Sequence, residues 1–147
     1  MIRILHNQKG IAAVEMAIGM LLLVPLLLIL VEASRALTEY SQLQNAAMEG
    51  ARMLARQNGD TDGVENYIKN TVLTDASGKS LFDGAEPTVT ISPRDADNNV
   101  TVQVDHDYNP SFMPQYDESG NPTPFNILGS DALTISAKTT MALPAEN

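Results

Sequence analysis

The sequence predicts an α+β protein, in which a long N-terminal membrane helix extends into a small domain. That domain contains a short second helix and an antiparallel sheet of three or more strands. Three observations lead to this prediction. An apolar run with a single charged residue, Glu15, occupies residues 11–31, and apolar residues then recur at spacings of three and four until about residue 54. From Thr88 onward, apolar and polar residues alternate with the period of a β-strand. A helical part followed by strands is typical of α+β folds.

The apolar run is long enough to cross a membrane. It reads IAAVEMAIGMLLLVPLLLILV from Ile11 to Val31. A helix of this length spans about 30 Å, the thickness of the hydrocarbon core of a bilayer. Arg3 and Lys9 precede the run without any acid, whereas acids outnumber bases after it, so the positive-inside rule places the N-terminus in the cytoplasm. We therefore divide the chain into a leader (1–10), a transmembrane and assembly helix (11–31) and an extracytoplasmic α+β domain (32–147).

Two other interpretations of this run fit less well. A cleaved secretory signal has a shorter apolar region that ends in a small-x-small cleavage site, and no such site follows Val31. A core helix of a water-soluble protein has a polar face, which the leucine-rich stretch lacks.

Two residues are unusual within the run. Glu15 places a carboxylate in a membrane helix, at a cost of about 2.5 kcal/mol or more at the bilayer centre and less near its surface. Glu15 either reaches the cytoplasmic surface or pairs with a cation that another molecule supplies. Pro25 removes one helical hydrogen bond and is either a tolerated kink or a weak point that eases packing between helices.

The helix is expected to continue beyond the membrane as far as about Gln57 and to end at Asn58-Gly59, a good C-terminal stop. Small side chains on one face of this extension allow another element to pack closely against it. Two interpretations are open: the small face packs against the sheet of the same chain, or it packs against helices of neighbouring subunits. The candidate helix-packing residues are Ala46, Ala47, Gly50 and Ala51.

A short second helix is expected from about Asp62 to Leu73, with Thr61 or Asp62 as its N-cap. Its buried face would consist of Val64, Tyr67, Ile68 and Val72.

Three segments have the alternation of strands: residues 88–92, 99–104 and 133–143. The first two flank a turn-like stretch, which indicates a β-hairpin. The amphipathic part of the long helix is expected to cover the apolar face of the sheet. Between the second and third strands, residues 109–129 hold four prolines and several aromatic residues. This segment either plugs the sheet edge with its aromatics or exposes a surface to a partner.

The sequence offers little catalytic or metal-binding chemistry, so we expect no enzyme, no metal and no cofactor. Cysteine is absent, which excludes disulfides and thiolate ligands. His106 lies between Asp105 and Asp107, a spacing that we interpret as a solvated strand end. Asp95-x-Asp97-x-Asn99 matches the opening of a calcium loop but lacks its glycine and closing glutamate. The net charge of −9, without a basic cluster, argues against binding to nucleic acid.

The leader and helix together resemble a known family. Lys9-Gly10-Ile11-Ala12-Ala13-Val14-Glu15 resembles a class III prepilin leader, in which glycine precedes four small or apolar residues and a glutamate. The segment Gly10 to Arg56 resembles the TadE-like pseudopilins and minor pilins of tight-adherence (Flp-type) pilus systems. The most specific block is LQNAAMEGAR, Leu43 to Arg52. The resemblance covers about the first third of the chain. One departure is Met16, where the family commonly has an aromatic residue.

The resemblance implies a pilin-like fold and a role in pilus assembly, at initiation or at the tip. It implies that a prepilin peptidase cleaves after Gly10 and makes Ile11 the mature N-terminus. Glu15 would then neutralise the new α-ammonium of a neighbouring subunit. The implied partners are other pilins or pseudopilins, the prepilin peptidase and the inner-membrane assembly platform. The implied location is the bacterial inner membrane, single-pass with the C-terminal domain in the periplasm, or outside the cell in the pilus.

The alternative function is a permanently membrane-anchored periplasmic sensor or ligand-binding domain. Such a protein would keep its leader and would be absent from sheared filaments.

Overall fold

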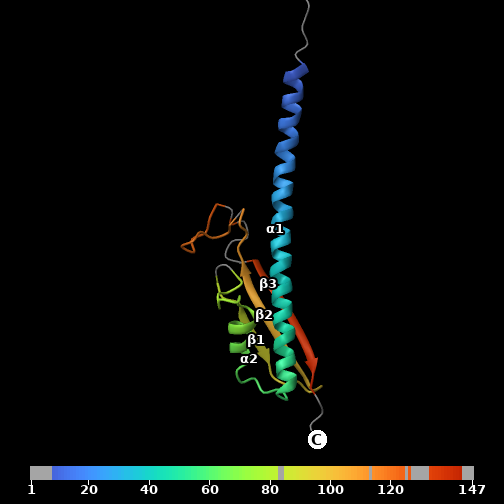
Figure 1. Ribbon diagram of the computed structural model, residues 1–147, viewed down its shortest axis with the longest axis vertical. Coiled ribbons are helices and arrows are strands. Elements are labelled where there is room, and N and C mark those ends of the chain that lie inside the picture. The colour runs from blue at the N-terminus through green and yellow to red at the C-terminus, as the bar shows by residue number, and fades with distance from the viewer. Residues whose placement is uncertain (1–7, 83–84, 113, 125, 127–132, 144–147) are drawn as a thin grey trace, which may run out of the picture.

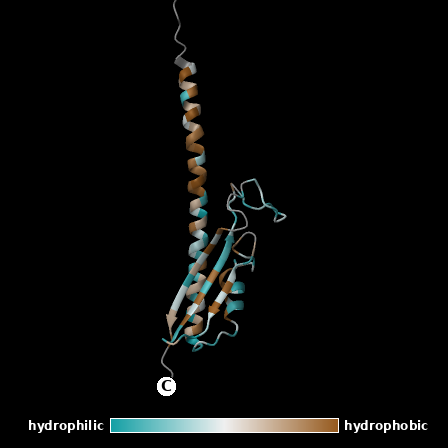
Figure 2. Ribbon diagram, turned by 180° about the vertical axis from the view of Figure 1, so that it is seen from behind, coloured by the Kyte–Doolittle hydropathy of each residue, from teal (hydrophilic) through white to brown (hydrophobic). Residues whose placement is uncertain are grey.

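The computed structural model describes residues 8–82, 85–112, 114–124, 126 and 133–143. It is an α+β fold in which one long helix, α1, extends far beyond the rest of the molecule (Figure 1). We call the described residues from Glu32 to Leu143 the head. The free half of α1 is almost uniformly hydrophobic, whereas its other half, which packs into the head, alternates between hydrophobic and hydrophilic residues (Figure 2).

Helix α1 runs from Gln8 to Arg56 and contains Pro25 without ending there. Its 49 residues make it about 74 Å long at 1.5 Å per residue. The helix stops as predicted, because Asn58 and Gly59 take positive φ angles of 55° and 88°. The Gly59 N–H donates to the Leu54 carbonyl at 2.8 Å and the Asn58 N–H to the Ala55 carbonyl at 3.4 Å. This pair of bonds satisfies two carbonyls of the last turn, as in a Schellman motif.

The second helix differs from the prediction in its cap and in its type. It begins as α2, Val64–Tyr67, and continues as a π-helical turn, η1, Ile68–Val72. The prediction of Thr61 or Asp62 as a side-chain cap was wrong, because the N-cap is Gly63 at φ 76°, with no side-chain hydrogen bond. Val64 and Ile68 are fully buried, as their spacing indicated.

The sheet has three antiparallel strands in the order β1-β2-β3. They are β1, Thr88–Ser92, β2, Asn99–Tyr108, and β3, Leu133–Ala142. Strand β2 continues to Tyr108 instead of ending at residue 104. One face of the sheet is lined by hydroxyl and amide side chains, such as Thr101 and Thr140, whose side-chain oxygens are 2.8 Å apart.

The other face of the sheet forms the core. Helix α1 crosses β2 and β3, while α2 lies beside β1 and η1 packs against α1 (Figure 1). The strand β2 contributes Val100, Val102 and Val104, which are at most 1% exposed. Because β2 runs antiparallel to α1, its C-terminal end lies near the start of the head. The buried apolar residues of the core are Leu43, Ala46, Ala47, Ala51, Leu54, Val64, Ile68, Leu73, Phe82, Val100, Val102, Val104, Ala137 and Leu143.

Candidate functional site

The residues expected at the processing site lie together at the free end of α1. Gly10, Ile11 and Glu15 are all exposed, and they border a shallow open hollow together with Val14 and Ile18. Residues four apart lie on one helix face, so Ile11 and Glu15 point the same way. Among the described residues, the Glu15 carboxylate has no hydrogen-bond or ion-pair partner. The Gly10–Ile11 peptide bond lies within the helix, which begins at Gln8.

The free half of α1 has an apolar surface that nothing in the head covers. In the part of the chain that the structure describes, this is the one helix long and apolar enough to cross a membrane, and its most apolar window is 0% buried. Leu21 and Leu22 are more than 70% exposed. Such a surface is unstable in water. It therefore requires either lipid or other apolar helices around it.

The small residues of α1 lie in the interior of the head, against the sheet of the same chain. Ala46, Ala47 and Ala51 are 0% exposed, and Gly50 is buried too. A Cβ atom at Gly50 would lie 2.5 Å from Ile68 Cδ1 and 3.3 Å from Val102 Cγ1. Of the two interpretations, packing against the sheet of the same chain therefore applies to Ala46, Ala47, Gly50 and Ala51 in the isolated chain.

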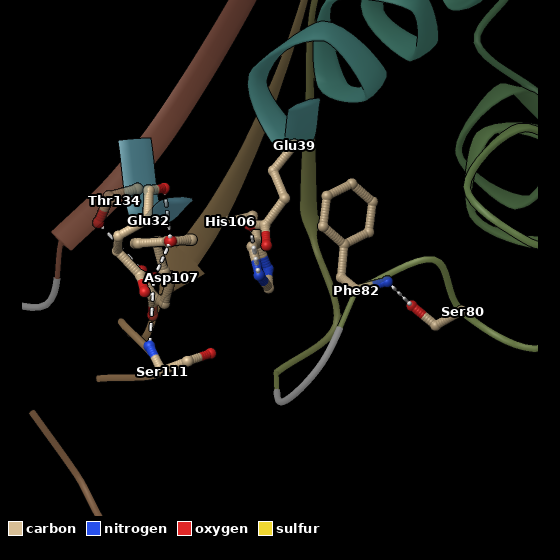
Figure 3. Close-up of polar contacts among 9 residues, drawn as sticks. Glu32, Glu39, Ser80, Phe82, His106, Asp107, Ser111 and Thr134 are labelled. Atoms are coloured by element: carbon tan, nitrogen blue, oxygen red, sulfur yellow. Dashed lines mark hydrogen bonds and ion pairs between the residues drawn. The ribbon is translucent and has the colours of Figure 1, made fainter. Parts of the chain in front are cut away.

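A polar contact that the sequence did not reveal joins α1 to the end of β2. The Tyr108 hydroxyl donates to Glu32 Oε1, and it also lies 3.3 Å from the Glu32 backbone carbonyl. The Ser111 N–H donates to the same carboxylate oxygen at 3.1 Å (Figure 3). Glu32 Oε2 is buried without a hydrogen-bond partner among the described residues. Burial, followed by the hydrogen bond to Glu32 and its negative charge, raises the pKa of Tyr108 far above the usual tyrosine value.

A second polar pair, His106 and Glu39, lies between β2 and α1, two residues before Tyr108 along the strand. His106 is 3% exposed, so the interpretation of this residue as a solvated strand end was wrong. Its Nε2 lies 3.7 Å from Glu39 Oε2, and its ring centroid lies 4.7 Å from that of Phe82 (Figure 3). Burial lowers the pKa of His106, although the negative charge of Asp107 and the Ala85 carbonyl raise it in part. The neutral imidazole is therefore favoured.

An apolar groove lies where the head meets the free half of α1, and we call it the boundary groove. It has a volume of about 570 Å³. One wall is α1 from Pro25 to Ala36, and the other wall includes Tyr108, Pro110, Phe112 and Leu133. Phe112 is 45% exposed, so this described aromatic of the 109–129 segment does not plug the sheet edge.

Three turns of the head share one hydrogen-bond pattern, and the calcium-loop-like stretch from Asp95 to Asn99 is one of them. In each turn an aspartate Oδ1 accepts the backbone N–H groups two and four residues ahead, at Asp75, Asp95 and Asp117. Hydrogen bonding lowers the pKa of all three carboxyls: the Ser77 hydroxyl contributes most at Asp75, and the backbone N–H groups of Asn99 and Asn121 contribute most at Asp95 and Asp117. No group of three or more metal-ligating side chains occurs among the described residues. The aspartates therefore close turns within the chain.

The alternation along β2 carried a signal for the two polar contacts. His106 and Tyr108 continue the inward pattern of Val100, Val102 and Val104. The charged residues Asp105 and Asp107 made the segment look like the end of the strand, although both lie on the opposite face of β2. The partners Glu32 and Glu39 lie in a helix far away in the sequence, so no local pattern could have identified them.

Comparison with known proteins gives one match. Residues 10–52 match the family model described as TadE-like protein. No curated protein and no solved structure matches. The matched segment contains the exposed apolar half of α1 and most of the part that packs on the sheet. Over residues 10–52, this chain is therefore similar to TadE-like proteins.

Proposed function

We propose that this protein is a pseudopilin or minor pilin that acts in the assembly of a tight-adherence pilus, at initiation or at the tip. In this proposal α1 holds the protein in the bacterial inner membrane with the head in the periplasm. A prepilin peptidase then cleaves after Gly10. The partners are other pilins or pseudopilins and the inner-membrane assembly platform. The observation that carries the proposal is the TadE-like match over the same residues that form the exposed apolar half of α1.

The local structure around Gly10 suits proteolysis. A peptidase needs an extended backbone, whereas Gly10 lies in the first turn of α1. Glycine is the weakest helix former after proline, so the helix end can unwind there at low cost. Cleavage would remove Arg3 and Lys9 and would create an α-ammonium at Ile11.

The role of Glu15 follows from the electrostatics of an apolar environment. An unpaired carboxylate and an unpaired ammonium are each costly in a low dielectric, and together they are much less so. Glu15 lies on the exposed face of α1 with no partner among the described residues. A neighbouring subunit's new N-terminus would supply the missing cation. A subunit inserted out of register would leave both charges unpaired, so the pair favours correct packing.

The apolar surface of α1 supports movement from membrane to filament. Lipid tails and neighbouring apolar helices both cover such a surface. Transfer between them therefore exchanges one apolar environment for another, and helix packing contributes the difference.

Replacement of Gly10 tests the proposal. We expect Gly10→Phe to block cleavage, so that the membrane protein retains Met1 and runs as a larger species on gels, as checked by mass spectrometry of its N-terminus. Gly19→Phe, in the same helix with open space around it, is the control and should be cleaved normally. Normal processing of Gly10→Phe would refute the assignment. So would a native protein that still begins at Met1, which is the state expected of a permanently anchored sensor.

A second variant separates assembly from processing. We expect Glu15→Gln to be cleaved normally but to be lost from sheared surface filaments, or from the complex isolated with the other pilins. Undiminished incorporation of Glu15→Gln would show that the carboxylate has no assembly role.

A further inference from the structure

We propose that the boundary groove is a lipid site: phospholipid of the leaflet nearer the head fills it, so that Pro110 and Phe112 lie in the membrane interface. This inference rests on the membrane-spanning position of α1 and adds a second contact between the protein and the bilayer.

The position of the groove along α1 is the first argument. Its helix wall runs from Pro25 to Ala36, while the apolar run ends at Val31. At 1.5 Å per residue, the wall begins about 9 Å inside the apolar run and ends about 8 Å beyond it. When residues 11–31 occupy the hydrocarbon core, the groove therefore straddles the surface of the bilayer. Because Phe112 faces the same groove as Leu28 and Ile29, this part of the head reaches the level of the lipid tails.

The polar contacts of Glu32 hold the two walls together at that level. Its carboxylate oxygen Oε1 accepts hydrogen bonds from the Tyr108 hydroxyl and from the Ser111 backbone N–H. Residue 111 lies between Pro110 and Phe112, so these bonds tie the outer wall to α1. Glu32 is the one Asp or Glu that lines the groove in the described structure; its Oε1 accepts from two donors, whereas its buried Oε2 has no hydrogen-bond partner there. Apart from Glu32, Tyr108 and Gln115, the residues that line the groove are apolar and suited to hydrocarbon.

The outer wall is held in place by its own hydrogen bonds. Asn109 Oδ1 accepts the Gln115 N–H at 2.7 Å, and the Gln115 carbonyl accepts the Thr123 N–H at 3.0 Å. Phe112 is therefore 45% exposed although hydrogen bonds hold the segment that carries it. Leu133, at the start of β3, is 40% exposed on the same wall. Exposed phenylalanine and leucine side chains are among those that segments at a membrane surface bury in the interface.

The surroundings favour lipid over a second copy of the chain as the occupant. One wall of the groove is continuous with the membrane-spanning surface of α1, which lipid covers in every inserted subunit before any assembly. The turn at Asp117 and Glu118, in the same segment, is acidic and exposed. It does not attract anionic headgroups, so we expect a zwitterionic lipid to be sufficient.

Single-tryptophan fluorescence in the full-length protein tests this inference, because the chain has no tryptophan of its own. The probe is Phe112→Trp. Two matched controls are Leu23→Trp, in the middle of the membrane span, and Tyr67→Trp, in α2 at the far side of the head (Figure 1). Each variant is reconstituted at a low protein-to-lipid ratio into phosphatidylcholine bilayers, with or without bromine on the acyl chains.

We expect brominated lipid to quench both Phe112→Trp and Leu23→Trp and to leave Tyr67→Trp unchanged. We also expect acrylamide in the water to quench Tyr67→Trp more than Phe112→Trp. Emission of Phe112→Trp that is indifferent to bromine while Leu23→Trp is quenched would overturn the lipid site but leave the membrane span intact. Loss of quenching for Leu23→Trp as well would overturn the membrane span itself. Shielding of Phe112→Trp that appears only at high protein-to-lipid ratios would identify a second protein copy as the occupant and would also overturn the proposal.

Discussion

At the scale of single residues, the least expected feature is the row of polar side chains that β2 directs into the helix–sheet interface. His106 and Tyr108 continue a row of buried valines and face acids on α1. Buried polar groups are costly unless they are paired. These contacts therefore specify which part of β2 lies against which turn of α1, which apolar packing alone determines less strictly.

The burial of His106 predicts a pH dependence of stability. Its pKa in the folded protein is lower than the usual 6.5, so the unfolded chain binds a proton more readily. The free energy of unfolding should therefore be greatest above pH 6.5 and should fall as the pH drops below it. We expect the melting temperature of the full chain in detergent to decrease by several degrees between pH 7.5 and pH 5.5, as checked by circular dichroism.

Two variants separate His106 from other titrating groups. His106→Gln cannot take up a proton and should make the melting temperature nearly independent of pH in this range. His6→Gln changes the other histidine of the chain and should keep the native slope. An unchanged slope in His106→Gln would contradict the assignment.

At the scale of the elements, the sequence predicted what local patterns determine. The end of α1 at Asn58-Gly59, the presence of three strands and the burial of Val64 and Ile68 all follow from periodicity and from turn residues. Tyr67 and Val72, expected on the same buried face, are only partly buried. The Gly63 cap and the π-helical turn of η1 were missed, because the cap depends on the positive φ angle of one glycine and no sequence pattern indicated the π-helical turn. The extension of β2 was missed since its inward polar residues are stabilised by partners on α1, 76 residues away for Tyr108 and Glu32.

The close packing of Ile68 against Gly50 predicts a strong effect of one added methyl group. In Gly50→Ala the new Cβ would lie 2.5 Å from Ile68 Cδ1, and Ile68 Cγ1 and Val102 Cγ1, at 3.2 and 3.3 Å, restrict any escape. We expect the head to lose about 1–3 kcal/mol of stability by overpacking, despite the better helix propensity of alanine. Gly19→Ala, which has nothing within 4 Å, is the control and should not destabilise the head. Equal denaturation midpoints for the two variants would show that η1 moves aside without cost.

At the scale of the whole molecule, the sequence predicted the division into an apolar helix and an acidic head, because composition and charge carry it. It did not predict the boundary groove or the Glu32 contact that closes it. Both depend on where the proline-rich segment at 109–126 returns to α1. That return is set by the tertiary structure, since no periodic pattern runs through this segment.

The Glu32 contact predicts how firmly the end of β2 is held to α1 beside the boundary groove. Tyr108→Phe removes the hydroxyl that donates to the Glu32 carboxylate and leaves the Ser111 N–H as its remaining described donor. We expect a loss of about 1.5–3 kcal/mol, the usual range for a hydrogen bond to a charged group. Tyr67→Phe is the control, because Tyr67 is half-buried and its hydroxyl has no hydrogen-bond partner among the described residues. Urea denaturation measures both, and equal midpoints would mean that the contact adds no stability.

The unbroken course of α1 from Gln8 to Arg56 has a further consequence. Each residue advances the helix by a fixed angle. The direction in which Glu15 points is therefore fixed relative to the sheet face that carries Thr101 and Thr140. Any contact that sets the rotation of the helix about its own axis also aims that distant face. Copies that dock through Glu15 in the same way would therefore all present the same side of the head to the outside.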